Sequence, residues 1–148
     1  MDTTSVRELL AEIGVVMDVF PAAEHLTSWA GLAARNHECA GKNTHTTHGN
    51  KATKVIMTEC AWCAARTKDI YFSARYKRFT SRRGKKRALV AIAAEMLKVV
   101  YHMLKDGTAY QELGADYMSN RRKDAQIKYH REQLNRLLGE DSPEAQSA

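Results

Sequence analysis

The chain has 148 residues, of which 44% are hydrophobic and 27% charged, and its 23 Lys and Arg outnumber its 17 Asp and Glu. This length and apolar content predict one folded domain, with or without a loose tail, and exclude a disordered protein. No apolar run approaches the roughly 18 residues of a membrane span, the first residues lack a signal-peptide pattern, and the three cysteines are an odd number, so we expect a cytoplasmic protein with reduced thiols.

Two short helices are predicted near the start of the chain. Ser5 and Glu8 have the spacing of a capping box at the start of the first helix, and Gly14 offers its end. The second helix is expected to open at Phe20–Pro21, because proline suits a first helical turn, and to close at Gly31.

A long irregular loop is predicted over residues 35–50, which are polar and lack any period. A loop of this length is typically functional or disordered. Residues 52–66 then predict an alanine-rich helix that is apolar on much of its circumference, which indicates a central position in the fold.

The clearest helix is predicted over residues 85–104 and ends at Gly107. Its helical-period stripe consists of Leu89, Ala93, Met96, Val100 and Met103. A last, very polar helix is expected over residues 121–138, with an acidic tail after it.

These elements predict an all-α fold, because the sequence contains no convincing strand and no internal repeat. We expect a compact helical domain over residues 1–118, and a polar helix with a tail over residues 119–148.

A basic segment precedes and opens the helix at residues 85–104. Its cations would neutralise rows of phosphates, and the aromatic residues between them could stack on unpaired bases. The alternative is a solvated helix, and both hold if Tyr71, Phe72 and Phe79 pack inward while Arg75, Arg78 and Arg82 point outward. The candidate nucleic-acid contacts of this segment are Arg75, Lys77, Arg78, Arg82, Arg83, Lys85, Lys86 and Arg87.

Two further clusters resemble chemical sites. His45, His48, Cys60 and Cys63 have the pairwise spacing of a zinc set, but the cysteines fall within a predicted helix, where buried thiols commonly act as small hydrophobic residues. We therefore predict no metal site. Cys39, which lies near Lys42 and several histidines, could be an activated nucleophile, although a single loop cysteine is more often inert. The acidic residues are scattered and form no two-metal pattern.

Several motifs, in order along the chain, together resemble a known family. They are Phe20–Leu32, Glu38–Lys42, Ala61–Lys68, Arg82–Ala88, Lys105–Tyr110 and Leu113–Tyr117. The run from about Leu9 to Tyr117 is similar to the C-terminal domain of the IS116/IS110/IS902-type transposases.

The resemblance implies a two-part enzyme. An N-terminal domain of ribonuclease-H type holds a four-acid magnesium site, and a serine in a Ser-Ala-Gly-Lys or Ser-Gly-Gly-Lys segment of the C-terminal domain becomes covalently joined to DNA. A structured guide RNA takes part, and the assembly is oligomeric. Cys39 stands here at the serine position, followed by Lys42. We expect a truncated chain that lacks the acidic domain, binds no Mg²⁺ itself and is inactive alone.

The leading hypothesis is a transposase fragment that binds DNA or guide RNA through Lys42 and the segment from Arg75 to Arg87. The alternative is a non-catalytic module that binds nucleic acid or full-length subunits and so inhibits transposition. A small zinc-dependent helical binder is a third possibility.

Overall fold

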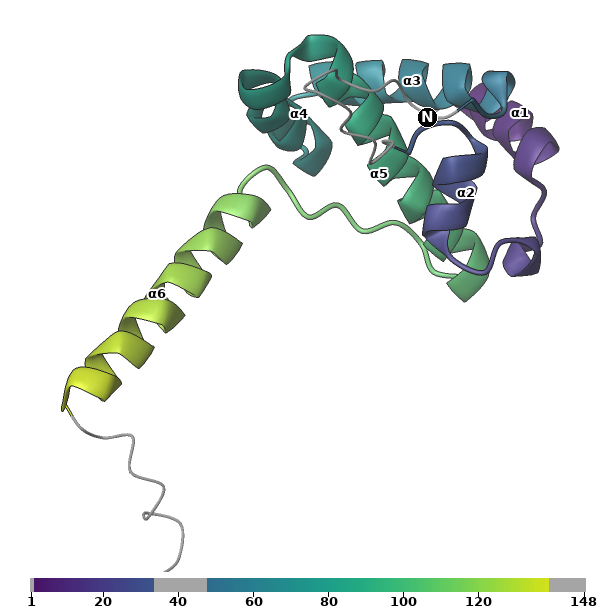
Figure 1. Ribbon diagram of the computed structural model, residues 1–148. Coiled ribbons are helices and arrows are strands. Elements are labelled where there is room, and N and C mark those ends of the chain that lie inside the picture. Colours follow the sequence, from purple (N-terminus) through teal and green to yellow (C-terminus); the bar gives the residue numbers. More distant parts are fainter. Residues whose placement is uncertain (1, 34–47, 139–148) are drawn as a thin grey trace, which may run out of the picture. The chain divides into compact units, whose positions relative to one another are not determined.

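The computed structural model describes residues 2–33 and 48–138, and its regular elements are all helical. In chain order they are α1 (Thr3–Ile13), the 3₁₀ turn η1 (Met17–Val19), α2 (Ala23–Trp29), α3 (Lys51–Arg66), α4 (Tyr71–Arg83), α5 (Lys85–Asp106) and α6 (Tyr117–Leu138) (Figure 1). The described residues contain no strand, which confirms the all-α prediction. No helix of the described residues is long and apolar enough to cross a membrane.

The chain divides into two units, Met1–Ala115 and Asp116–Ala148. The first holds α1 to α5 and a hydrophobic core, and the second holds α6. This division lies three residues before the domain boundary expected from the sequence.

Helix α5 is the centre of the first unit, since it contacts η1, α2, α3 and α4. It buries Ala88, Ile92, Ala93, Leu97 and Tyr101. Of the predicted stripe, Ala93 is fully buried, and Leu89, Met96 and Val100 are half-buried and pack against the core. The apolar face of α5 is therefore wider than the predicted stripe, because it also includes Ile92, Leu97 and Tyr101.

Helix α3 confirms the helix that was predicted over residues 52–66. It has one buried and one exposed face, whereas the sequence predicted burial on most sides. It buries Ile56, Met57 and Ala61 and leaves Val55 and Trp62 exposed. Helix α3 therefore covers one side of α5 and does not itself occupy the centre of the fold.

The first helix begins earlier than the capping-box spacing predicts. Asp2 is the N-cap of α1 and accepts a hydrogen bond of 3.0 Å from the Ser5 N–H, so Ser5 lies inside the helix and not at its cap. This hydrogen bonding with Ser5 lowers the pKa of Asp2. Gly14 ends α1 with a φ of 75°, as predicted.

The start of α2 was misplaced in the opposite direction, because this helix begins later than predicted. Helix α2 begins at Ala23, two residues beyond Pro21, and Phe20 is held instead by the core. The buried Tyr101 hydroxyl of α5 donates to the Phe20 carbonyl at 2.9 Å and accepts from Lys105 Nζ at 3.0 Å. The turn between η1 and α2 is therefore attached directly to the central helix.

Backbone contacts bring together the chain on either side of residues 34–47. The Asn50 N–H donates to the Trp29 carbonyl at 2.9 Å, and a Cβ on Gly49 would overlap the backbone of Trp29 and Gly31. Asn50 also caps α3 by accepting from the Thr53 N–H at 2.9 Å, and its amide donates to Glu12 at 2.7 Å. The chain thus leaves and re-enters the fold at one place, which we call the loop base (Trp29–Gly31 and Gly49–Asn50).

A clamp at Glu112 fastens the stretch after α5 to the start of α4. The Glu112 carboxylate accepts hydrogen bonds from the Tyr71 N–H at 2.7 Å, the Tyr110 hydroxyl at 2.8 Å and the Gly114 N–H at 3.0 Å. Burial alone would raise the pKa of Glu112, but these hydrogen bonds outweigh it and lower the pKa. The Tyr110 ring stacks on Phe72 with 6.1 Å between ring centroids. Glu112 therefore acts as a remote cap for α4, whose own N-cap residue, Ile70, has no side-chain hydrogen bond.

Candidate nucleic-acid interface

The aromatic residues of the basic segment point into the fold. On α4, Phe72 is buried, and Tyr71, Tyr76 and Phe79 are half-buried and pack against the core. The predicted inward packing of Tyr71, Phe72 and Phe79 is confirmed. Because these rings are used for packing, the segment exposes mainly its charges and no row of aromatic stacking surfaces.

The sequence suggested that Arg75 points outward together with Arg78 and Arg82. In the structure it does not. Its guanidinium forms a two-point pair with the Glu95 carboxylate of α5, with Nε–Oε2 and Nη2–Oε1 distances of 2.6 and 2.5 Å. It also lies 5.0 Å from the centroid of the Phe79 ring. The side chains of the pair are only 23% and 26% exposed. Hydrogen bonding to Glu95 raises the pKa of Arg75, and this residue fixes α4 against α5.

A substitution at Arg75 should therefore affect folding more than binding. We expect Arg75→Ala to lower the free energy of unfolding by about 2 kcal/mol, because it leaves Glu95 partly buried without its charged partner. Urea denaturation followed by circular dichroism measures this loss. Arg78→Ala, on the exposed side of α4, is the matched control and should change stability little. Equal stability of the two variants would contradict a structural role for Arg75.

The remaining seven candidate cations are all exposed. We call them the basic corner: Lys77, Arg78, Arg82 and Arg83 of α4, and Lys85, Lys86 and Arg87 of α5. None of them forms an ion pair with another residue in the described parts of the chain. Gly84 joins the two helices with a φ of 78°, a left-handed conformation that permits the abrupt change from α4 to α5.

The ends of the two helices affect these cations in opposite ways. Arg82 and Arg83 lie in the last turn of α4, where the partial negative charge of the helix end stabilises cations. Lys85, Lys86 and Arg87 lie in the first turn of α5, which has no acidic residue and no capping side chain. Cations there oppose the positive end of the helix dipole, so this turn has a strong positive potential that a bound anion would relieve.

The candidate nucleophile cannot be located in the same way. Cys39 and Lys42, with the segment Glu38–Lys42, lie outside the described residues. What the structure describes is the loop base, where the backbone on both sides of residues 34–47 is held together.

Of the four residues with the spacing of a zinc site, the structure describes three. His45 lies outside the described residues, His48 is exposed, and on α3 Cys60 is buried and Cys63 exposed. Desolvation raises the pKa of the Cys60 thiol, which disfavours the thiolate that a metal requires. Within residues 2–33 and 48–138, no group of three or more His, Cys, Asp or Glu side chains is arranged to hold a metal ion.

The sequence reasoning missed two carboxylates that hold α4 in place, Glu95 and Glu112. Glu95 could have been noticed, because it is the one acidic residue inside the apolar part of α5 and follows a strongly basic helix. Glu112 carries no comparable signal, since its three partners depend on how the stretch after α5 returns to α4.

Comparison with known proteins adds one finding. A family model described as the Transposase IS116/IS110/IS902 family matches residues 1–77, which is more than half of the chain. Comparison with curated proteins and with solved structures gave no match. The matched residues include α1 to α3, the segment with Cys39 and Lys42, and the first half of α4, whereas most of the basic corner follows them. The chain belongs to the IS116/IS110/IS902 family of transposases, and its role is in transposition.

Proposed function

We propose that this chain acts as the C-terminal domain of a transposase and binds the element's DNA or its guide RNA. The observation that carries the proposal is the basic corner, whose seven exposed cations lie on α4 and in the first turn of α5, on both sides of Gly84, without an acidic partner in the described residues. Phosphate groups of a nucleic-acid backbone are the natural counter-charge for such a cluster, because their neutralisation releases condensed counterions.

The buried aromatic rings favour one kind of recognition. With Phe72, Tyr76 and Phe79 packed in or against the core, the basic corner has charges for the phosphate backbone and few groups for base edges. Binding through this corner should therefore depend on salt and on backbone shape more than on sequence. We propose that Lys42, between the two halves of the loop base in the sequence, binds phosphate as well.

Binding of the purified chain to labelled duplex DNA and to structured RNA across a salt series tests this proposal. If all seven cations contact phosphates, the slope of log affinity against log salt approaches about −6. Arg82, Arg83, Lys85 and Lys86 changed together to Gln should make the slope shallower by about 3 to 4 units.

A matched control keeps the same change in net charge. Arg7, Lys51, Lys123 and Arg136 are also exposed, and their joint change to Gln should leave most of the slope in place. Equal losses in the two variants would mean that overall charge, and not the basic corner, attracts the nucleic acid. No binding at low salt would reject the proposal.

The catalytic part of the proposal rests on the motif Glu38–Lys42. We propose that the Cys39 thiolate takes the place of the family's serine when a separate N-terminal domain with its magnesium site is supplied by another subunit. The sulfur would attack a DNA phosphorus and form a P–S bond, while the P–O bond to the neighbouring nucleotide breaks and the released sugar oxygen gains a proton. Lys42 would stabilise the charge on the phosphate.

Mixing the chain with the N-terminal domain of an intact relative and element DNA tests this step. A protein–DNA adduct should form with Cys39 and with Cys39→Ser, and be absent with Cys39→Ala. If no variant forms an adduct, and co-expression with an intact relative suppresses transposition, the chain is instead a non-catalytic inhibitor.

A further inference from the structure

Helix α3 carries an exposed aromatic ring that the core does not use. Trp62 is 43% exposed, and it belongs neither to the buried core nor to the described residues that pack against it. Phe72, Tyr76 and Phe79 of the basic segment do belong to that packing. Trp62 therefore has a free ring surface of the kind that the rings of α4 lack.

A guanidinium lies against this ring. Arg66 follows Trp62 by about one turn of α3, and its Cζ is 4.8 Å from the centroid of the indole ring, which is within the range of a cation–π contact. Arg66 also lies in the last turn of α3, where the partial negative charge of the helix end stabilises a cation. Trp62 and Arg66, which we call the Trp–Arg pair, thus combine a flat apolar ring with a positive charge held beside it.

The charges around the Trp–Arg pair favour an anionic partner. Lys68 is exposed and lies two residues after Arg66. The acidic residues nearest in the sequence are Glu59, which lines an apolar groove between α1, α3 and α5, and Asp69, which lies in the turn before α4. The charged group at the Trp62 ring itself is a cation. A nucleotide matches this arrangement, because it has a flat base for the ring and a phosphate for the guanidinium.

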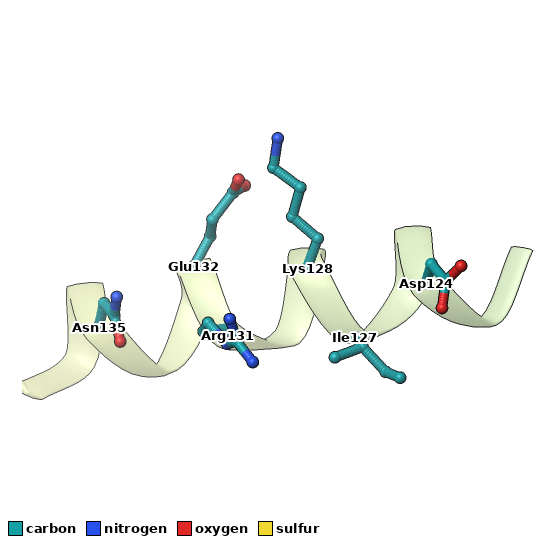
Figure 2. Close-up of a pocket in the computed structure, with 6 residues that line it drawn as sticks. All are labelled: Asp124, Ile127, Lys128, Arg131, Glu132 and Asn135. Atoms are coloured by element: carbon teal, nitrogen blue, oxygen red, sulfur yellow. The ribbon is translucent and has the colours of Figure 1, made fainter. Parts of the chain in front are cut away.

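The surface hollow of the other basic helix, α6, offers no such pair (Figure 2). Six residues of this one helix line the hollow, and none of them is aromatic: Asp124, Ile127, Lys128, Arg131, Glu132 and Asn135. In the figure, Glu132 projects from the same side of the helix as Lys128, so a carboxylate accompanies the cation there. The hollow of α6 therefore has charges of both signs and no stacking surface.

We propose that Trp62 stacks on an unpaired base of the bound nucleic acid while Arg66 binds an adjacent phosphate. The inference rests on the proposed function and adds a ligand class to it. The basic corner cannot distinguish paired from unpaired segments, because both carry the same phosphates. A base within a duplex is stacked on its neighbours and has no free face, so the Trp–Arg pair selects nucleotides that are single-stranded or turned out of a helix.

Fluorescence of Trp62 tests the stacking directly. The chain has two tryptophans, so Trp29→Phe leaves Trp62 as the single emitter. The Trp29 ring lies edge-on to Phe20, a contact that a phenyl ring can keep. In this background a short oligothymidylate should quench the emission, because a base lies against the indole. A duplex of the same length should bind through the basic corner without quenching.

The affinity for the same oligothymidylate tests the contribution of the ring. Trp62→Ala should lower this affinity about 10-fold, and Trp62→Phe, which keeps a ring, should restore most of it. Val55→Ala is the matched control, since Val55 is 48% exposed and lies seven residues before Trp62 on the same face of α3. Its change should leave the affinity unaltered. Circular dichroism verifies that each variant is folded.

Photochemical crosslinking locates the contact. An oligothymidylate with one 5-iododeoxyuridine should crosslink to the tryptic peptide Val55–Arg66, with the modification on Trp62, as followed by mass spectrometry. A crosslink on Tyr129, which is 57% exposed on α6, in place of Trp62 would reject the inference, because the unpaired base would then stack on α6.

Binding to duplex DNA separates this inference from the function on which it rests. If the chain binds no nucleic acid, both fail. If the duplex binds with the expected salt slope, but oligothymidylate causes no quenching and binds Trp62→Ala as well as the unaltered chain, the inference alone is rejected. Equal losses of duplex and oligothymidylate binding in Trp62→Ala would also contradict a contact that is specific for unpaired bases.

Discussion

Lys85→Glu/Lys86→Glu should weaken nucleic-acid binding and at the same time make the fold more stable. Both residues lie in the uncapped first turn of α5, where their charges oppose the helix dipole. Glutamates there reverse the sign of that interaction, so we expect the unfolding temperature to rise by about 2–5 °C. Loss of two phosphate contacts, with repulsion in their place, should lower affinity about 100-fold at low salt and make the salt slope shallower by about 2 units.

Lys51→Glu separates these two effects. Lys51 is the first residue of α3 and is exposed, so its change to glutamate also improves the charge of a helix N-terminus. It should raise the unfolding temperature slightly and leave binding unaltered. Differential scanning fluorimetry and the salt-dependent binding assay measure both quantities. A double variant that is less stable than the unaltered protein would contradict the electrostatic account of the α5 N-terminus.

Gly49→Ala should destabilise the fold by roughly 3 kcal/mol, near the upper end of what one added methyl group usually costs. The new Cβ would overlap the Gly31 nitrogen, the Trp29 oxygen and the Ala30 carbonyl carbon, which are backbone atoms with no rotamer in which to move away. The loop base would have to open and lose the hydrogen bond from the Asn50 N–H to the Trp29 carbonyl. Urea denaturation followed by circular dichroism measures the loss.

Gly114→Ala is the control for the general cost of replacing a glycine. Gly114 has a φ of 77° and open space around its missing Cβ, so alanine there meets only the strain of the left-handed conformation, about 1–2 kcal/mol. Gly49 has no such φ, and its replacement reports steric overlap alone. A Gly49→Ala protein as stable as the unaltered chain would show that the two backbone segments of the loop base are not in contact.

Helix positions were largely predictable because the signals that end helices are local. Gly14 and Gly107 both adopt positive φ and end α1 and α5 where the sequence suggested. The start of α1 was misplaced because the Ser5–Glu8 spacing matches a capping box, whereas Asp2 lies nearer the end of the chain and takes the cap. The sequence prediction considered only Ser5, although aspartate is an equally good N-cap residue.

The candidate interface was predictable in composition and not in geometry. That Arg82, Arg83, Lys85 and Lys86 would be exposed follows from their charge. That Arg75 would not join them depends on Glu95, which is 20 residues away and reaches it only because the chain reverses at Gly84. The roles of Cys39 and Lys42 stay predictions, since both lie outside the described residues.

The stripe of α5 shows a further limit of sequence reasoning. Leu89, Met96 and Val100 pack against the core but stay half-buried, whereas Ile92, Leu97 and Tyr101 are fully buried. Periodicity marks the apolar face of a helix, but it does not say which residues of that face lie deepest.

The loop base has a consequence for how this transposase can diversify. Backbone contacts already hold residues 29–31 against residues 49–50. The segment between them is therefore not needed to close the fold. Doubling the length of such a segment costs only about 0.6 kcal/mol of loop-closure entropy. Insertions, deletions and substitutions between residues 34 and 47 should therefore leave the packing of α2 and α3 unchanged, so the length and composition of this segment can vary independently of the fold.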